Sequence, residues 1–271
     1  MPVACLYDVH GNLPALEAVL EEVLRSEADH IVVGGDLVPG PFPRECFDLL
    51  NSLDIPTEYI IGNGDRETLI AMRGPVSSAV PQYFHEAIAW NAAQLTENDA
   101  KAIAQWPLTR RLHVGGIGDV IFCHATPRND SEIFMRTTSD ATLMPIFEPL
   151  GVHAVVCGHT HMQHDRTVGT TRIINAGSIG ASFQGPGAYW AILGPTVQLR
   201  RTYYDIDKAA ARVRATSYPQ AEQFAATSVL QPPTEEATLK LFEKDWRTSL
   251  TRSMLQAIPL PLQLPKVSQV S

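Results

Sequence analysis

Seven residues with metal-binding side chains follow short apolar runs of the sequence. They comprise two carboxylates, one amide and four imidazoles: Asp8, His10, Asp36, Asn63, His124, His159 and His161. Glycines stand beside most of them, as in Gly34-Gly35-Asp36, and allow the backbone to turn sharply. In open α/β sheets, ligands bind beyond the carboxyl ends of the strands. We therefore predict that these side chains gather at one edge of the fold.

The spacing of the seven side chains indicates two metal ions rather than one. Asp8 and His10 are two residues apart, as are His159 and His161, so each pair projects to one side of an extended segment. Mixed nitrogen and oxygen ligands suit zinc, manganese or iron, and suit calcium poorly. Seven ligands are too many for one tetrahedral ion and are natural for two ions bridged by Asp36. Each motif alone has another explanation, because HxH is often incidental, DxHGN can cap a helix and GN can form a turn.

The elements that must position these residues follow an α/β pattern. Six runs rich in Val, Ile or aromatic residues are predicted as buried strands, at 3–7, 30–33, 58–61, 119–123, 153–157 and 171–174. Helices are predicted for 13–27, capped by Asn12, for 43–53 and for most of 80–112. Two strands, 188–193 and 196–204, precede three further predicted helices at 207–216, 218–227 and 234–257.

Length and charge limit the domain organisation and the partners. We predict one large domain over residues 1–205, a helical extension packed on it over 206–258 and a disordered tail over 259–271. Of the 271 residues, 45% are hydrophobic, which is enough for a sizeable core. The net charge of -8 argues against a surface for duplex nucleic acid. It permits a small anionic substrate, since bound cations would reverse the local sign.

The cysteines and the hydropathy pattern point to the cytoplasm. Cys5, Cys46, Cys123 and Cys157 form no CxxC pair and are predicted to be buried, reduced thiols. The first residues lack the charge and the apolar core of a signal peptide. No stretch approaches the ~20 apolar residues of a membrane span, so we expect no membrane partner. A homo-oligomer remains open.

The ordered motifs resemble the calcineurin-like metallophosphoesterase superfamily, specifically its small prokaryotic phosphodiesterase-like branch. The resemblance lies in Asp8–Asn12, Gly34–Asp36, Gly62–Asp65, His124 and Gly158–His161, and in the flanking segments DLVPGPFP and NAGSIG. It implies a four-layer α/β/β/α sandwich of two mixed sheets. It specifies the fold and the metal site closely, and the substrate poorly.

The resemblance also implies a role for each ligand. Asp8, His10 and His161 would hold one metal; Asn63, His124 and His159 would hold the second; and Asp36 would bridge both together with a solvent hydroxide. Metal coordination lowers the pKa of water to about 7, so this hydroxide would attack phosphorus at neutral pH. The two divalent ions are expected to be manganese, iron, zinc or nickel. A small phosphorylated molecule is the expected substrate.

Two departures from the family pattern concern catalysis. Relatives commonly have GNH followed by an acid, with the histidine as proton donor to the leaving group; here that position is Gly64. Asp65 is a candidate substitute that would join Asp36 and Asn63 as a catalytic residue, unless it only holds the turn. Gly64 itself could be required for a positive φ. Protein-phosphatase members carry an arginine after the second aspartate motif, whereas residues 37–43 contain none before Arg44.

Three other residues are candidates for contacting the substrate. Arg66 and Arg128 could bind phosphate, with solvated surface positions as the alternative for both. Asn12 could contact phosphate or only cap its helix. We expect an active hydrolase of phosphodiesters or nucleotide phosphates, because all seven ligand positions are occupied. The alternative is a catalytically weak or inactive interaction module that keeps the fold, which drifted ligands would mark.

Overall fold

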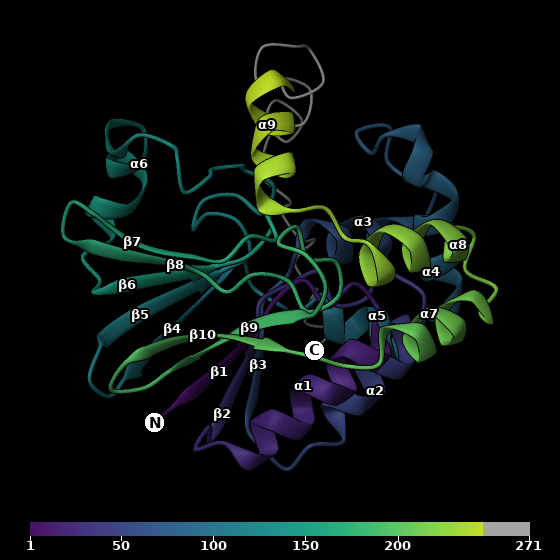
Figure 1. Cartoon of the computed structure of the whole chain (residues 1–271), viewed down its shortest axis with the longest axis horizontal. Coiled ribbons are helices and arrows are strands. Elements are labelled where there is room, and N and C mark those ends of the chain that lie inside the picture. Colours follow the sequence, from purple (N-terminus) through teal and green to yellow (C-terminus); the bar gives the residue numbers. More distant parts are fainter. Residues whose placement is uncertain (246–271) are drawn as a thin grey trace, which may run out of the picture.

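The structure, a computed structural model, describes residues 1–245, and within them ten strands form two five-stranded sheets (Figure 1). The first sheet has the order β10-β9-β1-β2-β3. Neighbouring strands are parallel from β1 to β3 and antiparallel from β1 to β10. The strands are β1 (Val3–Leu6), β2 (His30–Val33), β3 (Thr57–Tyr59), β9 (Ala188–Leu193) and β10 (Val197–Thr202).

The second sheet has the order β4-β5-β6-β8-β7. Its central pairs are parallel and its two edge pairs are antiparallel. Its strands are β4 (Thr109–Val114), β5 (Gly118–Cys123), β6 (Ala154–Cys157), β7 (His164–Val168) and β8 (Thr171–Asn175). Both sheets are therefore mixed, as the family resemblance implies.

The two sheets pack face to face through one apolar core. Val3 and Cys5 of the first sheet belong to the same buried cluster as Phe122 and Val156 of the second. The hydroxyl of Tyr7 donates to the Val156 carbonyl across this interface, at 3.1 Å. Helices α1 (Leu13–Arg25) and α2 (Pro43–Asn51) cover the outer face of the first sheet, and α6 (Asp140–Phe147) covers that of the second (Figure 1). The result is the expected four-layer α/β/β/α sandwich.

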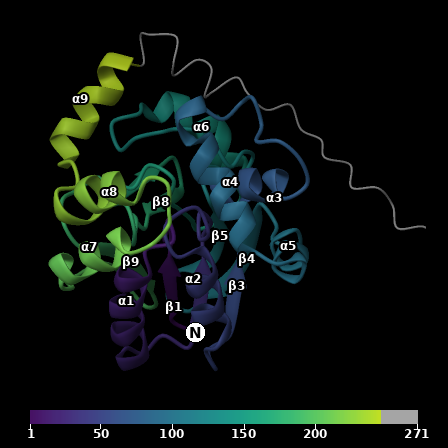
Figure 2. The same cartoon turned by 90° about the vertical axis from the view of Figure 1, so that its right-hand side faces the viewer.

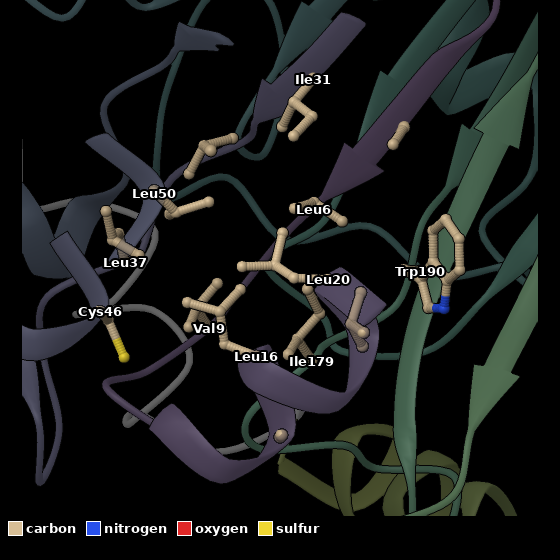
Figure 3. Packing of buried hydrophobic residues seen from close by; sticks show 14 of the residues in the cluster. Leu6, Val9, Leu16, Leu20, Ile31, Leu37, Cys46, Leu50, Ile179 and Trp190 are labelled. Atoms are coloured by element: carbon tan, nitrogen blue, oxygen red, sulfur yellow. The ribbon is translucent and has the colours of Figure 1, made fainter. Parts of the chain in front are cut away.

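Helix α1 fixes the loop that carries the first two candidate ligands. The Asn12 side chain caps it by accepting from the amide of Ala15 at 3.3 Å. Leu16 and Leu20 of its buried stripe lie in the cluster that contains Leu6 of β1 (Figure 3). Burying each such leucine contributes about 1.5–3 kcal/mol. The segment between β1 and α1 is thus held at both ends.

Two groups of helices lie beside the sandwich. Between β3 and β4 come α3 (Asn63–Ala71), a 3-10 turn (Gln82–Phe84), α4 (His85–Gln94) and α5 (Glu97–Ile103). A second 3-10 turn, Glu148–Leu150, follows α6. After β10 come α7 (Ile206–Arg214), α8 (Ala221–Phe224), a π-helical segment (Ala225–Leu230) and α9 (Glu235–Asp245). Helices α3, α4 and α8 lie on the same side of the molecule, which faces the viewer in Figure 2.

The differences from the predicted elements have local physical reasons. The predicted helical segment 80–112 does contain helices, but its last residues belong to β4, whose sequence TRRLHV lacks the apolar run of a buried strand. The edge strand β7, HDRTV, was not predicted for the same reason. Neither was α6, nor α3, which begins at an asparagine and a glycine that favour turns. The third predicted strand, 58–61, is β3 and ends at Tyr59.

Several expectations fall partly outside these observations. The tail 259–271, the last residues of the extension 206–258 and the end of the helix predicted for 234–257 lie outside the described residues. The domain division stays a prediction. All four cysteines are buried and free, as expected. Among residues 1–245 no helix combines the length and the apolar content needed to cross a membrane.

His164 generates a prediction about stability and pH. Burial lowers the pKa of this β7 side chain to about 4, with Arg166 adding to the effect and Asp165 and Glu235 opposing it. The unfolded chain would bind the proton near pH 6.5, so folding loses stability as pH falls below that value. His164→Gln removes this titrating group. Between pH 7.5 and pH 5 the variant should therefore lose less free energy of unfolding than wild type, by up to about 2 kcal/mol.

Urea unfolding of wild type and variant between pH 7.5 and pH 5 measures the effect. His113→Gln is the matched control, because the His113 side chain is 75% exposed. Parallel stability curves for wild type and His164→Gln would contradict the prediction.

Candidate metal centre

Five of the seven predicted ligands share an uncommon backbone conformation. Asp8, His10, Asp36, His159 and His161 have φ between 47° and 64°, and they are all the non-glycine residues with positive φ in the described chain. Left-handed conformations of this kind cost on the order of 1–3 kcal/mol each and cluster at functional sites. The strand ends are therefore held in sharp turns that direct polar side chains to one place.

Backbone hydrogen bonds hold these turns together. The amide of Asp8 donates to the carbonyl of Gly35 at 3.1 Å, and that of His10 to the carbonyl of Asp36 at 2.9 Å. Gly35 has a φ of +94°, and a Cβ at this position would lie 2.7 Å from Nδ1 of His124. Glycine is required here by both its conformation and the close approach of the second sheet's ligand.

The first group of ligands consists of Asp8, His10 and His161. The Nε2 atoms of the two histidines are 3.1 Å apart, and Nε2 of His161 is 3.1 Å from Oδ1 of Asp8. Their Nδ1 atoms face the carbonyls of Pro39 (3.3 Å) and Ala181 (2.6 Å). Because a carbonyl only accepts, Nδ1 must carry the proton in both rings. In the neutral rings, two bare Nε2 lone pairs and a carboxylate oxygen therefore converge.

The second group consists of Asn63, His124 and His159. Nδ1 of His124 donates to the carbonyl of Gly34 at 2.9 Å, which leaves the Nε2 lone pair facing Oδ1 of Asn63 at 3.1 Å. The same amide group lies 3.0 Å from Nδ1 of His159. Without a cation, the amide nitrogen would face the two rings and donate to both. With a cation between them, the amide oxygen faces inward as a ligand.

Asp36 lies between the two groups. Its Oδ1 accepts from the amide of Gly64 at 2.7 Å, which leaves Oδ2 3.7 Å from Nε2 of His10 and 3.7 Å from Nε2 of His124. Oδ1 of Asp8 is likewise 3.8 Å from both of these nitrogens. Asp36 thus lies between the two groups, and its bridging role stays a prediction. The geometry also gives Asp8 a position shared by both groups, which the sequence did not reveal.

These atoms could hold divalent ions. Oδ1 of Asp8 is fully buried and has no hydrogen-bond partner. Two sets of ligand atoms, from Asp8, His10 and His161 and from Asp8, Asp36 and His124, each lie within 4.8 Å of one another. A buried carboxylate oxygen facing several lone pairs is costly unless a cation neutralises it. The donor set therefore fits transition-metal ions, which accept nitrogen and oxygen ligands together.

The charges in the centre favour this use. Burial by itself raises the pKa of Asp8, but His161 and His124 outweigh it and hold the pKa below its usual value. Burial, with His124 beside it, lowers the pKa of His159 to about 4. Burial lowers the pKa values of His161 and His124, but the carboxylates of Asp8 and Asp36 outweigh it and raise both. Asp8 and His159 thus have the protonation states that metal ligation requires, and a bound cation would displace the protons that the same carboxylates attract to His161 and His124.

The carboxyl group of Asp65 is enclosed by backbone amides and does not line the cavity described below. It is fully buried, and its Oδ1 accepts from the amides of Leu37 (2.9 Å) and Val38 (3.0 Å). Its Oδ2 accepts from the amide of Gly62 at 3.1 Å. Burial and the neighbouring Asp36 raise the pKa of Asp65 to about 7. A carboxyl group enclosed by three backbone donors cannot reach a leaving group, so it ties the loop after Asp36 to the start of α3.

The structure does not bring all three predicted substrate contacts to the centre. Asn12 is fully buried, and its Nδ2 donates to the carbonyl of Gly180 at 2.9 Å while Oδ1 caps α1. Arg128 is 59% exposed and pairs with Glu132 on the surface. Arg66 does face the centre's cavity. The geometry favours the capping alternative for Asn12 and the surface alternative for Arg128.

Gly64 has a packing reason to be glycine. It lies in the first turn of α3 and is absent from the positive-φ residues, so no left-handed backbone is needed. A Cβ at Gly64 would lie 2.6 Å from Cγ of Pro39 and 3.0 Å from Oδ1 of Asp36. The proline ring thus fills part of the space that a side chain at position 64 would need.

A cavity of about 550 Å³ opens beside the candidate ligands. Five of the seven line it, namely His10, Asp36, Asn63, His159 and His161. Five aromatic side chains from three distant segments also line it and form its aromatic wall: Tyr83, Phe84, Phe183, Tyr218 and Phe224. Sequence reasoning missed this wall. The available signal was the presence of aromatic residues in amphipathic helices, which a buried core explains equally well.

Comparison with known proteins agrees with this geometry. A family model described as the calcineurin-like phosphoesterase superfamily domain matches residues 1–196. The chain therefore belongs to the calcineurin-like phosphoesterase superfamily. An uncharacterized protein of Methanocaldococcus jannaschii is 26% identical over 242 residues, which are 80% of this chain and 94% of that protein.

Two solved structures share the fold. A metallophosphoesterase of Sphaerobacter thermophilus is 26% identical, with a TM-score of 0.64, and the alignment covers 83% of this chain and 98% of the other. A hypothetical protein of Pyrococcus horikoshii OT3 is 19% identical, with a TM-score of 0.73 and coverage of 83% and 97%. The similarity extends past residue 196, since 83% of the chain exceeds the family match.

The role of Asp65 can be tested by Asp65→Asn. An amide retains one acceptor oxygen, so at least one of the three backbone donors would lose its partner, at a cost of about 1–3 kcal/mol. We expect a lower melting temperature, and no change in how kcat depends on the leaving group's pKa. A flat wild-type dependence that becomes steep in Asp65→Asn would show that Asp65 donates the proton.

The role of Gly64 can be tested by introducing at this position the histidine of the family pattern. Because the new Cβ would overlap Pro39, Gly64→His alone should destabilise the protein by about 1–3 kcal/mol. The double variant Pro39→Ala/Gly64→His should recover part of this and flatten the steep dependence of kcat on leaving-group pKa that we expect for wild type. A series of substituted phenyl phosphodiesters measures the slope, with Pro39→Ala as control. Equal melting temperatures for wild type and Gly64→His would contradict the packing account.

Proposed function

We propose that the chain is a dinuclear-metal-dependent phosphoesterase that hydrolyses phosphodiesters or nucleotide phosphates. One observation carries the proposal. Imidazole nitrogens and carboxylate oxygens converge across the strand ends, as near as 3.1 Å, beside a substrate-sized cavity. An interaction module would gain nothing from holding these atoms so close together. The membership of the phosphoesterase superfamily supports the same reaction class.

The residues divide into two ligand sets with shared carboxylates. Asp8, His10 and His161 would hold one ion, Asn63, His124 and His159 the other, and Asp36 would contact both. When bound, such ions lower the pKa of coordinated water and neutralise charge that develops on a phosphoryl group. The backbone carbonyls behind the histidines fix the ring tautomers, and the Gly64 amide fixes Asp36.

The donor set also guides the choice of metal. Four imidazoles with carboxylate and amide oxygens suit manganese, iron, zinc and nickel better than calcium. We propose a cytoplasmic protein, since its four cysteines are free and buried. A small phosphorylated molecule is the proposed substrate.

Metal removal and Asp36→Asn test the proposal together. We expect chelator treatment to abolish hydrolysis of bis(p-nitrophenyl) phosphate and to lower the melting temperature, and manganese to restore both. An amide supplies one weaker oxygen where an anionic pair can contact two ions. Asp36→Asn should therefore lower the bound metal and reduce kcat by at least about 100-fold.

Asp99→Asn is the matched control. Asp99 is also buried, at 6% exposure, but it caps α5 and does not line the cavity. It should leave the metal content and kcat near wild type. Full activity in chelator, or equal losses in both variants, would overturn the proposal.

A further inference from the structure

The cavity beside the metal centre is lined by two chemically different groups of side chains. One group consists of candidate ligands such as His10 and His161. The other is the aromatic wall, in which Phe183 stacks on the His161 ring with centroids 4.7 Å apart. Tyr83, Phe84, Tyr218 and Phe224 complete this wall. A molecule with its reacting group beside the candidate ligands would place the attached group among these rings.

Two segments far apart in the sequence build this wall jointly. Tyr83 and Phe84 precede α4, whereas Tyr218 and Phe224 belong to the region of α8 (Figure 2). Nε2 of Gln220 donates to the carbonyl of Tyr83 at 2.9 Å. The Tyr218 ring also packs edge-on against that of Trp90, with centroids 5.3 Å apart. The two segments are thus in contact, and together they form one continuous part of the cavity lining.

Two of these rings are exposed to an extent that core packing does not explain. Tyr83 is 61% exposed and Phe84 is 42% exposed, and their rings meet edge to face at 5.0 Å. Both line the cavity. Exposed large apolar side chains gathered in a concave site are typical of ligand-binding walls.

Positive charge is scarce in the cavity. Among the described residues that line it, Arg66 is the only arginine or lysine. Its Nε and Nη2 donate to both oxygens of Asp130, at 2.6 and 3.3 Å, and Nη1 donates to Glu67 at 2.5 Å. The guanidinium is thus neutralised by two carboxylates. A second phosphate group, away from the metals, would meet no uncompensated cation there.

We propose that the substrate carries a single phosphoryl group whose retained ester substituent bears a flat aromatic ring, either a simple aryl group or the base of a nucleoside. The proposal rests on the phosphoesterase function and specifies its substrate class. The phosphoryl group lies beside the candidate ligands, and the ring lies against Tyr83 and Phe84. The cavity volume of about 550 Å³ suits a molecule of nucleotide size. Chains of several phosphates are excluded by the lack of cations.

Gln223 offers a way to distinguish the two kinds of ring. Gln223 lines the cavity, and among residues 1–245 its side-chain amide makes only a 3.4 Å contact, to Oγ1 of Thr227. It remains available to hydrogen-bond the edge of a nucleobase, which a phenyl group lacks. Stacking on aromatic side chains would serve both ligands, because every base and aryl group has a π face.

The test uses esters that share one leaving group and differ in the retained group. In the manganese-loaded protein, p-nitrophenyl phosphodiesters bearing methyl, n-hexyl, phenyl or thymidine 5′ groups are compared. We expect KM for the phenyl and thymidine esters to be about tenfold below those for methyl and hexyl. The p-nitrophenyl ester of thymidine 5′-diphosphate, with one more phosphate, should show a kcat/KM at least about tenfold below that of the monophosphate ester.

Variants then locate the ring. Tyr83→Ala and Phe84→Ala should raise KM for the phenyl and thymidine esters about tenfold and leave that for the methyl ester unchanged. Gln223→Leu should affect thymidine alone if the natural ring is a base, and neither ester if it is aryl. Tyr203→Ala is the matched control, since Tyr203 is 72% exposed and lies outside the cavity.

The outcomes separate this inference from the proposed function. Hydrolysis with equal KM for methyl, hexyl and phenyl esters, or a preference for hexyl, would overturn the inference that the wall binds an aromatic ring. The proposed phosphoesterase function would still stand. If no ester is hydrolysed, the proposed function fails. Calorimetric measurement of phosphonate binding then still tests whether the wall binds an aromatic ring. Phenylphosphonate should bind the manganese-loaded protein about tenfold more tightly than methylphosphonate, and equal binding would overturn the inference.

Discussion

The structure depends on holding electron-rich atoms close together against their mutual repulsion. Carboxylate oxygens of Asp8 and Asp36 share a small volume with imidazole lone pairs, and Asp8 has a buried oxygen without a hydrogen-bond partner. Five ligand positions also adopt left-handed backbone, at on the order of 1–3 kcal/mol each. The free energy gained by burying the two-sheet core offsets both costs, because the core fixes the strands at whose ends these turns lie. Bound cations would turn the repulsion into attraction and so stabilise the fold that concentrates it.

The sequence predicted best what depends on local pattern. Buried strands such as residues 30–33 are continuous apolar runs, and the ligands follow them directly, so both the α/β class and the grouping of ligands could be inferred. The strands β4 and β7 were not predicted because their side chains are largely polar. Each pairs with the strand that follows it, β5 or β8, so its place in the sheet depends on that partner rather than on its own apolar pattern. Helix α3 escaped because Asn63 and Gly64 favour turns locally, while the tertiary structure uses them to begin a helix.

The roles of individual site residues depended on partners that no pattern reveals. Asp65 could be an acid or a turn residue until its three backbone donors were located. Gly64 could reflect a positive φ or a steric limit, and the ring of Pro39 decides for the latter. Arg128 resembled Arg66 in sequence context, yet a glutamate four residues later holds it at the surface. Each decision rests on contacts between segments that are distant in sequence or on side chains whose direction the sequence does not fix.

The molecule separates reaction chemistry from substrate choice. Most of the candidate metal ligands follow strands, whose positions are fixed by the core of the sandwich, and Asn63 begins α3. The aromatic wall comes from the helices between β3 and β4 and from those after β10, which pack beside that core. On the proposed function, changes in the wall would therefore alter which ester group is held without replacing any candidate ligand, because the two sets share no residue. Two contacts would link substrate fit to the geometry of the candidate ligands: the Phe183 ring stacks on that of His161, and α4 packs against α3, whose first residue is Asn63.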